Sequence, residues 1–113
     1  MEHRYNPRVA CAAPARAEGP RGPLRGQCRS LSQGGLFFLG AQLPVGQRVE
    51  LSVELPRLGR VEALGEVRYH YSTPEGQGMG VRFTRLGQES LALIQRFVAG
   101  QRRPPSSPPS SGQ

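Results

Sequence analysis

The sequence predicts a mainly β domain of about six short antiparallel strands, folded as a sandwich or a barrel, with one helix near the C-terminal end. Two observations carry this prediction. Apolar and polar residues alternate with a period of two through the middle of the chain, and clusters of Gly and Pro separate these stretches. The period changes once, after Gly87, to the spacing of an amphipathic helix.

The N-terminal third has the weakest strand pattern. Residues 1–8 are polar, and we expect a first strand from Val9 to about Ala13. We expect a loop over residues 14–26, because this stretch holds three Pro and three Gly residues. A second strand is expected from Gln27 to Leu31.

The middle of the chain gives the clearest strands. Leu36 to Leu39 is short and apolar throughout, as a buried strand would be, and Gly40 stops it. From Gln47 to Leu55, apolar residues alternate strictly with polar ones. We therefore expect a half-buried antiparallel strand there.

A turn at residues 56–59 leads into a return strand. The alternation places five residues of this strand on one inward face: Val61, Ala63, Val67, Tyr69 and Tyr71. After a second turn at residues 72–76, a last strand alternates Met79, Val81 and Phe83 with smaller or polar residues. Serial hairpins of this kind are typical of antiparallel sheets.

The helix is predicted from four apolar residues at three- and four-residue spacing: Leu91, Ile94, Phe97 and Val98. We expect Gly100 to end it and the helix to cover one end of a barrel. Residues 101–113 are rich in Pro and Ser and are expected to be disordered. Residues 9–100 then form a single ordered domain.

The composition argues against an enzyme or a metal site. All 15 basic residues are Arg and all eight acidic residues are Glu, so chemistry that depends on Asp or on a Lys Schiff base is excluded. The glutamates alternate outward on strands, which does not suit an acid–base pair. The cysteines and histidines lack metal-ligand spacing. We expect no enzyme activity, no metal and no cofactor.

The sequence also predicts a cytoplasmic location. The chain opens without the apolar stretch of a signal peptide, and no apolar run is long enough to cross a membrane. Cys11 and Cys28 are interpreted as ordinary buried thiols in a reducing compartment.

The positive charge is concentrated at the N-terminal end. The formal net charge is +7, of which residues 1–35 carry +4 and residues 36–101 only +1. Clustered charge acts through the local electrostatic potential, so this end is expected to meet an anionic partner. A merely solvated basic segment is the alternative.

Two short motifs lie within this basic end. Arg4 and Arg8 stand four residues apart around Asn6-Pro7, and a pair of guanidinium groups can bind phosphates or the O6/N7 edge of guanine. The segment from Ser30 to Gly35 leaves a strand and turns. Its hydroxyls can cap the turn, and we expect Gly35 to adopt a backbone conformation that other residues avoid.

With both motifs in this order on such strands, the sequence resembles the PilZ domain family, bacterial receptors for the second messenger cyclic di-GMP. The family's RxxxR matches Arg4 and Arg8, and its [D/N]xSxxG matches Ser32 and Gly35. Ser30 stands where the family has Asp or Asn. Gly80-Val81-Arg82-Phe83 looks like the GxxF-type strand that precedes the family's helix.

The resemblance implies a six-stranded barrel with a C-terminal helix and cyclic di-GMP as the ligand. It implies that Arg4 and Arg8 grip guanine edges and phosphates, while Ser30, Ser32 and Gly35 contact a guanine and shape the floor of the site. Residues 1–8 are expected to be a mobile ligand-binding segment. The expected function is a receptor that passes the second-messenger level to an unidentified partner protein.

Two alternatives remain. The first is a degenerate adaptor that binds protein only, because Ser30 reaches less far than Asp or Asn. An Arg-rich nucleic-acid binder is disfavoured, because residues 36–101 are balanced in charge and aromatic residues are few.

Overall fold

The computed structural model describes residues 8–102 of the chain. Its elements are β1 (Val9–Gly19), β2 (Gly22–Leu31), β3 (Gly35–Leu39), β4 (Arg48–Leu55), β5 (Gly59–Thr73), β6 (Gly76–Leu86) and α1 (Gln88–Arg102). Residues 1–7, which include Arg4, and residues 103–113 lie outside the described part, as do the expectations for them. The tail predicted from residue 101 begins with two residues that are still helical.

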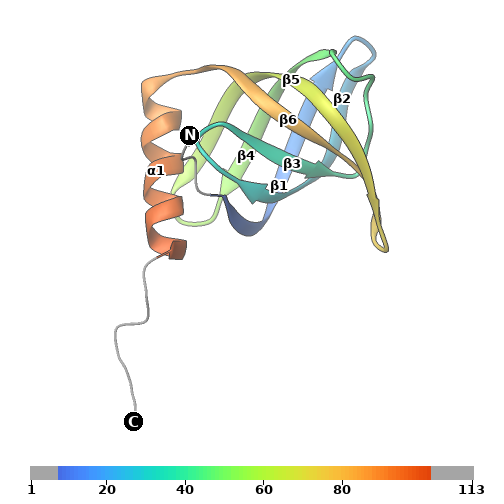
Figure 1. Ribbon diagram of the computed structural model, residues 1–113. Helices are drawn as coiled ribbons and strands as arrows, with labels where there is room; N and C mark the ends of the chain where they lie inside the picture. The colour runs from blue at the N-terminus through green and yellow to red at the C-terminus, as the bar shows by residue number, and fades with distance from the viewer. Residues whose placement is uncertain (1–7, 103–113) are drawn as a thin grey trace, which may run out of the picture.

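The six strands form one closed barrel in the order β1-β2-β3-β6-β5-β4 (Figure 1). Every neighbouring pair is antiparallel, and β1 closes the barrel by pairing with β4 between Ala15–Glu18 and Glu50–Val53. Closure leaves no free sheet edge. The predicted six-stranded antiparallel barrel is therefore confirmed.

The loop predicted over residues 14–26 is wrong, because these residues complete a long β1–β2 hairpin. Its turn lies between Gly19 and Gly22, which pair directly. Ala13, Ala15 and Ala17 are buried on alternate positions of β1. The prolines of these strands are exposed, so they take outward positions without interrupting the inward row. The buried positions of this alternation are occupied by small alanines, and the neighbouring prolines made the stretch look like a loop.

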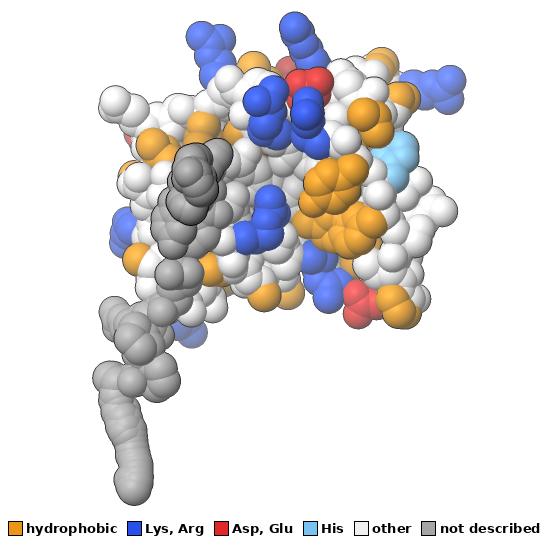
Figure 2. Space-filling model, in the orientation of Figure 1, with side chains coloured by type: hydrophobic (Ala, Val, Ile, Leu, Met, Phe, Trp, Pro, Cys, Tyr) orange, Lys and Arg blue, Asp and Glu red, His pale blue; other side chains and the backbone are white. Residues whose placement is uncertain are grey.

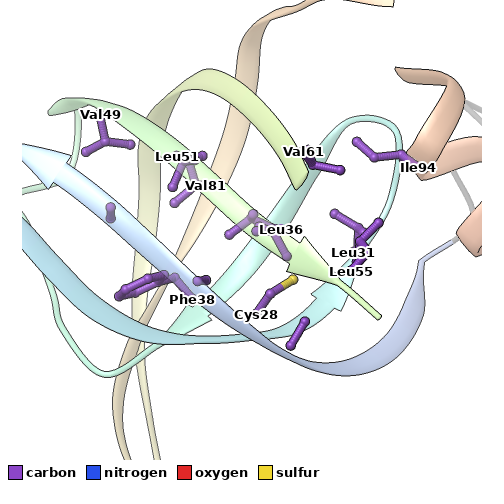
Figure 3. Close-up of a cluster of buried hydrophobic side chains, with 14 of the residues drawn as sticks. Cys28, Leu31, Leu36, Phe38, Val49, Leu51, Leu55, Val61, Val81 and Ile94 are labelled. Carbon is purple, nitrogen blue, oxygen red and sulfur yellow. The ribbon is translucent and has the colours of Figure 1, made fainter. Parts of the chain in front are cut away.

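The core fills the inside of the barrel (Figure 3). Its largest fully buried side chains come from five strands and the helix: Phe38, Leu31, Leu36, Met79, Ile94, Val53, Val61 and Val67. Burial of one such side chain stabilises the fold by about 1.5–3 kcal/mol. The inward positions expected for β4 are confirmed, since Val49, Leu51, Val53 and Leu55 are all buried.

Helix α1 lies across one end of the barrel (Figure 1). Ile94 is fully buried and points toward Val61, Leu31 and Leu55 at that end (Figure 3). The helix runs to Arg102, two residues beyond the stop expected at Gly100. A helical Gly costs only about 1 kcal/mol relative to Ala, which the continuing helix tolerates.

Ser90 links the first turn of α1 to the sheet by a hydrogen bond. Its Oγ accepts a hydrogen bond of 2.9 Å from the backbone N–H of Glu62 on β5, and the residue is 8% exposed. A buried N–H without a partner costs about 1–3 kcal/mol. The contact therefore helps to hold α1 over the barrel end.

We expect Ser90→Ala to lower the free energy of unfolding by about 1–2 kcal/mol, because it leaves the Glu62 N–H without an acceptor. Chemical denaturation measures this. Ser52→Ala on β4 is the matched control and should change stability by less than about 0.5 kcal/mol. Equal effects of the two variants would contradict the role of Ser90.

Within residues 8–102, α1 is neither long nor apolar enough to cross a membrane.

Candidate functional site

The turn between β2 and β3 is built around Ser32. Its backbone N–H donates to the carbonyl of Gly35 at 2.9 Å. Its Oγ accepts from the N–H of Gly34 at 3.1 Å and donates to the Gly35 carbonyl at 3.4 Å. The residue is 2% exposed, so its hydroxyl is committed to the turn. Ser32 therefore shapes the turn that borders the site, with its hydroxyl hydrogen-bonded to the backbone of Gly34 and Gly35.

Gly35 is required by a close approach of two strands. A Cβ on Gly35 would overlap the carbonyl oxygen of Val81 and lie 3.2 Å from the Cα of Arg82, both on β6. The unusual backbone conformation expected for Gly35 is wrong, since its φ is not among the positive values found at other glycines. The physical reason for glycine here is space between β3 and β6.

Arg8 and Ser30 are brought together by strand register. Arg8 immediately precedes β1, and Val9 and Ala10 pair with Leu31 and Ser30 at the end of β2. The Nη1 of Arg8 donates a hydrogen bond of 3.0 Å to the Oγ of Ser30. The first motif's second arginine and the divergent position of the second motif are thus in direct contact.

Two bulges turn further side chains toward this place. The register shifts between Cys28 and Ser30 on β2, and between Val67 and Tyr69 on β5. An extra residue in a bulge re-aims the side chains that follow it. Tyr69 was expected on the inward face, but after the β5 bulge it is 49% exposed. The core prediction for Tyr69 is therefore wrong.

The ring of Tyr69 lies over Gly80 on β6. A Cβ at Gly80 would overlap this ring, so the glycine makes the room that lets the ring lie against the strand. Tyr71 follows on β5, and its ring contacts Phe37. Tyr71 is also more exposed than the expected inward position, and partial burial raises the pKa of its phenol to about 12. The phenol is neutral at physiological pH.

These residues border a cleft of about 220 Å³ on the barrel wall. It is lined by Arg8, Ser32, Gly34, Gly35, Arg68, Tyr69, Gly80, Val81 and Arg82. Figure 2 shows basic side chains in blue around a pale hollow and an apolar patch on one face of the molecule. Arg8 of the first motif, Ser32 and Gly35 of the second motif and the GxxF-type strand thus meet at one cleft.

The cleft is positively charged. Arg8, Arg68 and Arg82 line it, and its nearest acid is Glu66. One oxygen of Glu66 lies 3.4 Å from Nη2 of Arg82, and the other lies 3.8 Å from Nη1 of Arg68. The single carboxylate of Glu66 thus lies between two of the three guanidinium groups. The cleft keeps a net positive charge, which favours an anionic ligand.

A larger cleft of about 490 Å³ lies elsewhere, over β1, β4, β5 and β6. Its arginines, Arg16, Arg60 and Arg85, are matched by three glutamates, Glu18, Glu50 and Glu62. This balance gives no preference for an anion, and among residues 8–102 no residue of either motif lines this cleft. The smaller cleft is the candidate site.

Arg68, Tyr69 and Arg82 were not predicted as lining residues. The bulge on β5 moves Tyr69 off the inward face, whereas Arg68 and Arg82 lie on the exposed face that the alternation gives them. Their meeting at one cleft depends on the order of the strands in the barrel, which the alternating pattern does not reveal. The signal that was present is the pair Gly78 and Gly80, since small residues on a central strand mark close approach of another group.

The fold and the cleft define the class of the protein: a small antiparallel β-barrel with a basic site on its wall and a helix at one end. The PilZ domain family model matches residues 2–100. The chain belongs to the PilZ domain family.

Solved structures with the same fold include the inhibitor of motility of Bacillus subtilis, with a TM-score of 0.74, 19% identity, and coverage of 91% of this chain and 55% of that one. YcgR of Escherichia coli in complex with cyclic di-GMP has a TM-score of 0.77 and 19% identity, covering 91% of this chain and 47% of that one.

The PilZ domain of the same Escherichia coli protein, with cyclic di-GMP, has a TM-score of 0.71 and 16% identity, covering 90% of this chain and 93% of that domain. At these identities the likeness concerns the fold. The present chain spans about half the length of the first two proteins. No curated protein sequence matches it.

Proposed function

We propose that this chain is a receptor domain for cyclic di-GMP, which binds in the cleft beside Arg8. The observation that carries the proposal is the convergence of Arg8 from the first motif with Ser32 and Gly35 from the second on one arginine-lined cleft. PilZ neighbours solved with cyclic di-GMP support the choice of ligand.

The chemistry of the cleft suits a ligand with two phosphates and two guanines. The forked guanidinium of Arg8 can pair in bidentate fashion with a phosphate or with the O6/N7 edge of guanine. Arg68 and Arg82 add positive charge, and the exposed ring of Tyr69 offers a surface on which a base can stack. Arg4, outside the described residues, is proposed as the second arginine of the clamp.

The proposed output is a signal to a partner protein, with the domain acting as a receptor or adaptor and without catalysis. We expect a receptor for a bacterial second messenger to act in the cytoplasm.

One observation favours a second candidate, an adaptor that binds protein and not the dinucleotide. Ser30 replaces the family's Asp or Asn, and its hydroxyl accepts from Arg8, the residue that the ligand must engage. Binding would have to replace this hydrogen bond. Loss of an Asp or Asn contact to guanine costs about 1–3 kcal/mol of binding free energy. Binding is then weaker, but the positive charge of the cleft remains. The receptor is therefore favoured.

Calorimetric titration of the full chain with cyclic di-GMP tests the proposal, with GTP and a short oligonucleotide as controls. We expect saturable binding of cyclic di-GMP alone. No heat with any of the three would favour the adaptor. Binding of the oligonucleotide alone, with a linear dependence of log K on log salt, would favour a nucleic-acid binder.

We expect Tyr69→Ala to weaken cyclic di-GMP binding about tenfold, because stacking of one base on an aromatic ring contributes about 1–3 kcal/mol. Tyr69→Phe keeps the ring and should stay within about twofold of the parent, since the ring and not the hydroxyl is proposed to bind. The dissociation constants of both variants check this. Equal losses in the two variants would contradict stacking.

A further inference from the structure

Two cysteines lie side by side next to the candidate site. Cys11 sits in the β1 bulge between Ala10 and Ala13, and Cys28 faces it from β2. Both thiols are free, and their Sγ atoms are 3.2 Å apart. In a disulfide the two sulfurs are about 2.05 Å apart, so a small approach is enough to join them.

The two thiols differ in exposure and acidity. The hydrogen bond with Cys28 lowers the pKa of Cys11, and the charge of Arg29 adds to this against the opposing effect of burial. Cys28 is fully buried, and its pairing with Cys11 together with burial raises its pKa. In the neutral pair the Cys11 thiol has two acceptors on Cys28, the carbonyl oxygen at 3.0 Å and the Sγ at 3.2 Å. When Cys11 loses its proton, Cys28 becomes the donor. Cys11, which is partly exposed, is therefore the reactive thiolate.

We propose that Cys11 and Cys28 are a redox modification site that a peroxide converts to an intramolecular disulfide. The Cys11 thiolate attacks one peroxide oxygen, the O–O bond breaks, and a sulfenic acid forms as the other oxygen leaves as water or an alcohol after protonation. The sulfur of Cys28 then attacks that of Cys11. The S–S bond forms, the S–O bond breaks, and the hydroxyl leaves as water with the Cys28 proton. Two thiols lose two electrons, and one peroxide gains them.

The pair is connected to Ser30 by one hydrogen bond. In the neutral pair the Sγ of Cys28 donates to the carbonyl oxygen of Ser30 at 3.3 Å, and the Oγ of Ser30 accepts from Arg8. A disulfide has no thiol hydrogen, so the Ser30 carbonyl loses this donor while β1 and β2 are drawn together. Oxidation therefore disturbs the position of Ser30 beside Arg8. The consequence for cyclic di-GMP rests on the function proposed above.

The chemical test needs no ligand. The full chain is treated with hydrogen peroxide, free thiols are alkylated, and peptide masses are determined with and without prior reduction. We expect a Cys11–Cys28 cross-link within one chain. Cys28→Ser should stop at a sulfenic acid on Cys11 that dimedone traps, and Cys11→Ser should leave Cys28 unoxidised. Two freely alkylated thiols after peroxide, cross-links between chains only, or equal oxidation of the two variants would overturn the proposal.

The second test compares cyclic di-GMP affinity before and after oxidation. We expect it to fall about fivefold, the equivalent of one lost hydrogen bond, and to recover on treatment with a thiol reductant. Cys11→Ser should be insensitive to peroxide. A disulfide that forms without changing affinity would overturn the link to Ser30. Absence of binding by the reduced chain would count against the proposed function, and the thiol result would stand apart from it.

Discussion

Replacing Arg8 by alanine is expected to weaken cyclic di-GMP binding about 100-fold or more. Removing one partner of a hydrogen-bonded charge pair costs about 2–5 kcal/mol, and every 1.4 kcal/mol is tenfold in affinity. Arg8 is exposed, and its one described hydrogen bond is to Ser30. Such a contact contributes little to folding, so the melting temperature should stay almost unchanged.

The matched control is Arg85→Ala, which removes an exposed arginine from the larger cleft. Both variants lose one positive charge, so a nonspecific electrostatic effect would weaken binding equally. We expect calorimetry to show near-parental affinity for Arg85→Ala. Unaltered affinity in Arg8→Ala, or a larger loss in Arg85→Ala, would contradict the proposal that cyclic di-GMP binds in the cleft beside Arg8.

The second large effect that we expect is a gain in affinity for cyclic di-GMP. Ser30→Asn is expected to tighten cyclic di-GMP binding about tenfold, because the amide supplies a longer-reaching acceptor toward the guanine N–H groups. It also removes the serine hydroxyl that accepts a hydrogen bond of 3.0 Å from Nη1 of Arg8.

Ser30→Asp should gain less than Ser30→Asn. Its carboxylate would form an ion pair with Arg8 and repel the phosphates of the ligand at short range. Ser30 lies in β2 and not in the turn that follows, so a purely structural role of residue 30 predicts no gain in affinity, and a loss of stability in both variants because Asn and Asp are unfavourable in strands. Melting temperatures and dissociation constants for both variants separate the two roles. If neither variant binds better than the parent, the adaptor should replace the receptor.

The fold was largely predictable because its strands follow elementary periodicity. Val49 to Leu55 alternates without interruption, and burial follows that alternation residue by residue. The β1–β2 hairpin was not predicted, because Ala supplies little hydrophobic signal and Pro14 and Pro23 look like loop residues. Their outward position depends on the pairing partners, which local sequence does not specify.

The site was predictable only where its residues belong to motifs. Arg8, Ser32 and Gly35 line one cleft and Ser30 accepts a hydrogen bond from Arg8, whereas Arg4 lies outside the described residues. Their role in binding stays a prediction. Tyr69 was missed because a bulge on β5 shifts its inside–outside phase. Arg68 was missed because the alternation does not say which outward side chains meet at a cleft. The contact between Cys11 and Cys28 likewise depends on the β1 bulge, so both thiols looked like ordinary core residues.

The measurement that tests the central claim most directly is a map of amide hydrogen exchange in the full chain with and without cyclic di-GMP. We predict slower exchange in residues 1–8, because the anion joins two arginines that otherwise repel each other, and around Gly35 and Gly80 in the cleft. Exchange at Glu50 and Glu62 in the larger cleft should not change. Protection at the larger cleft, with none in residues 1–8, would contradict the account.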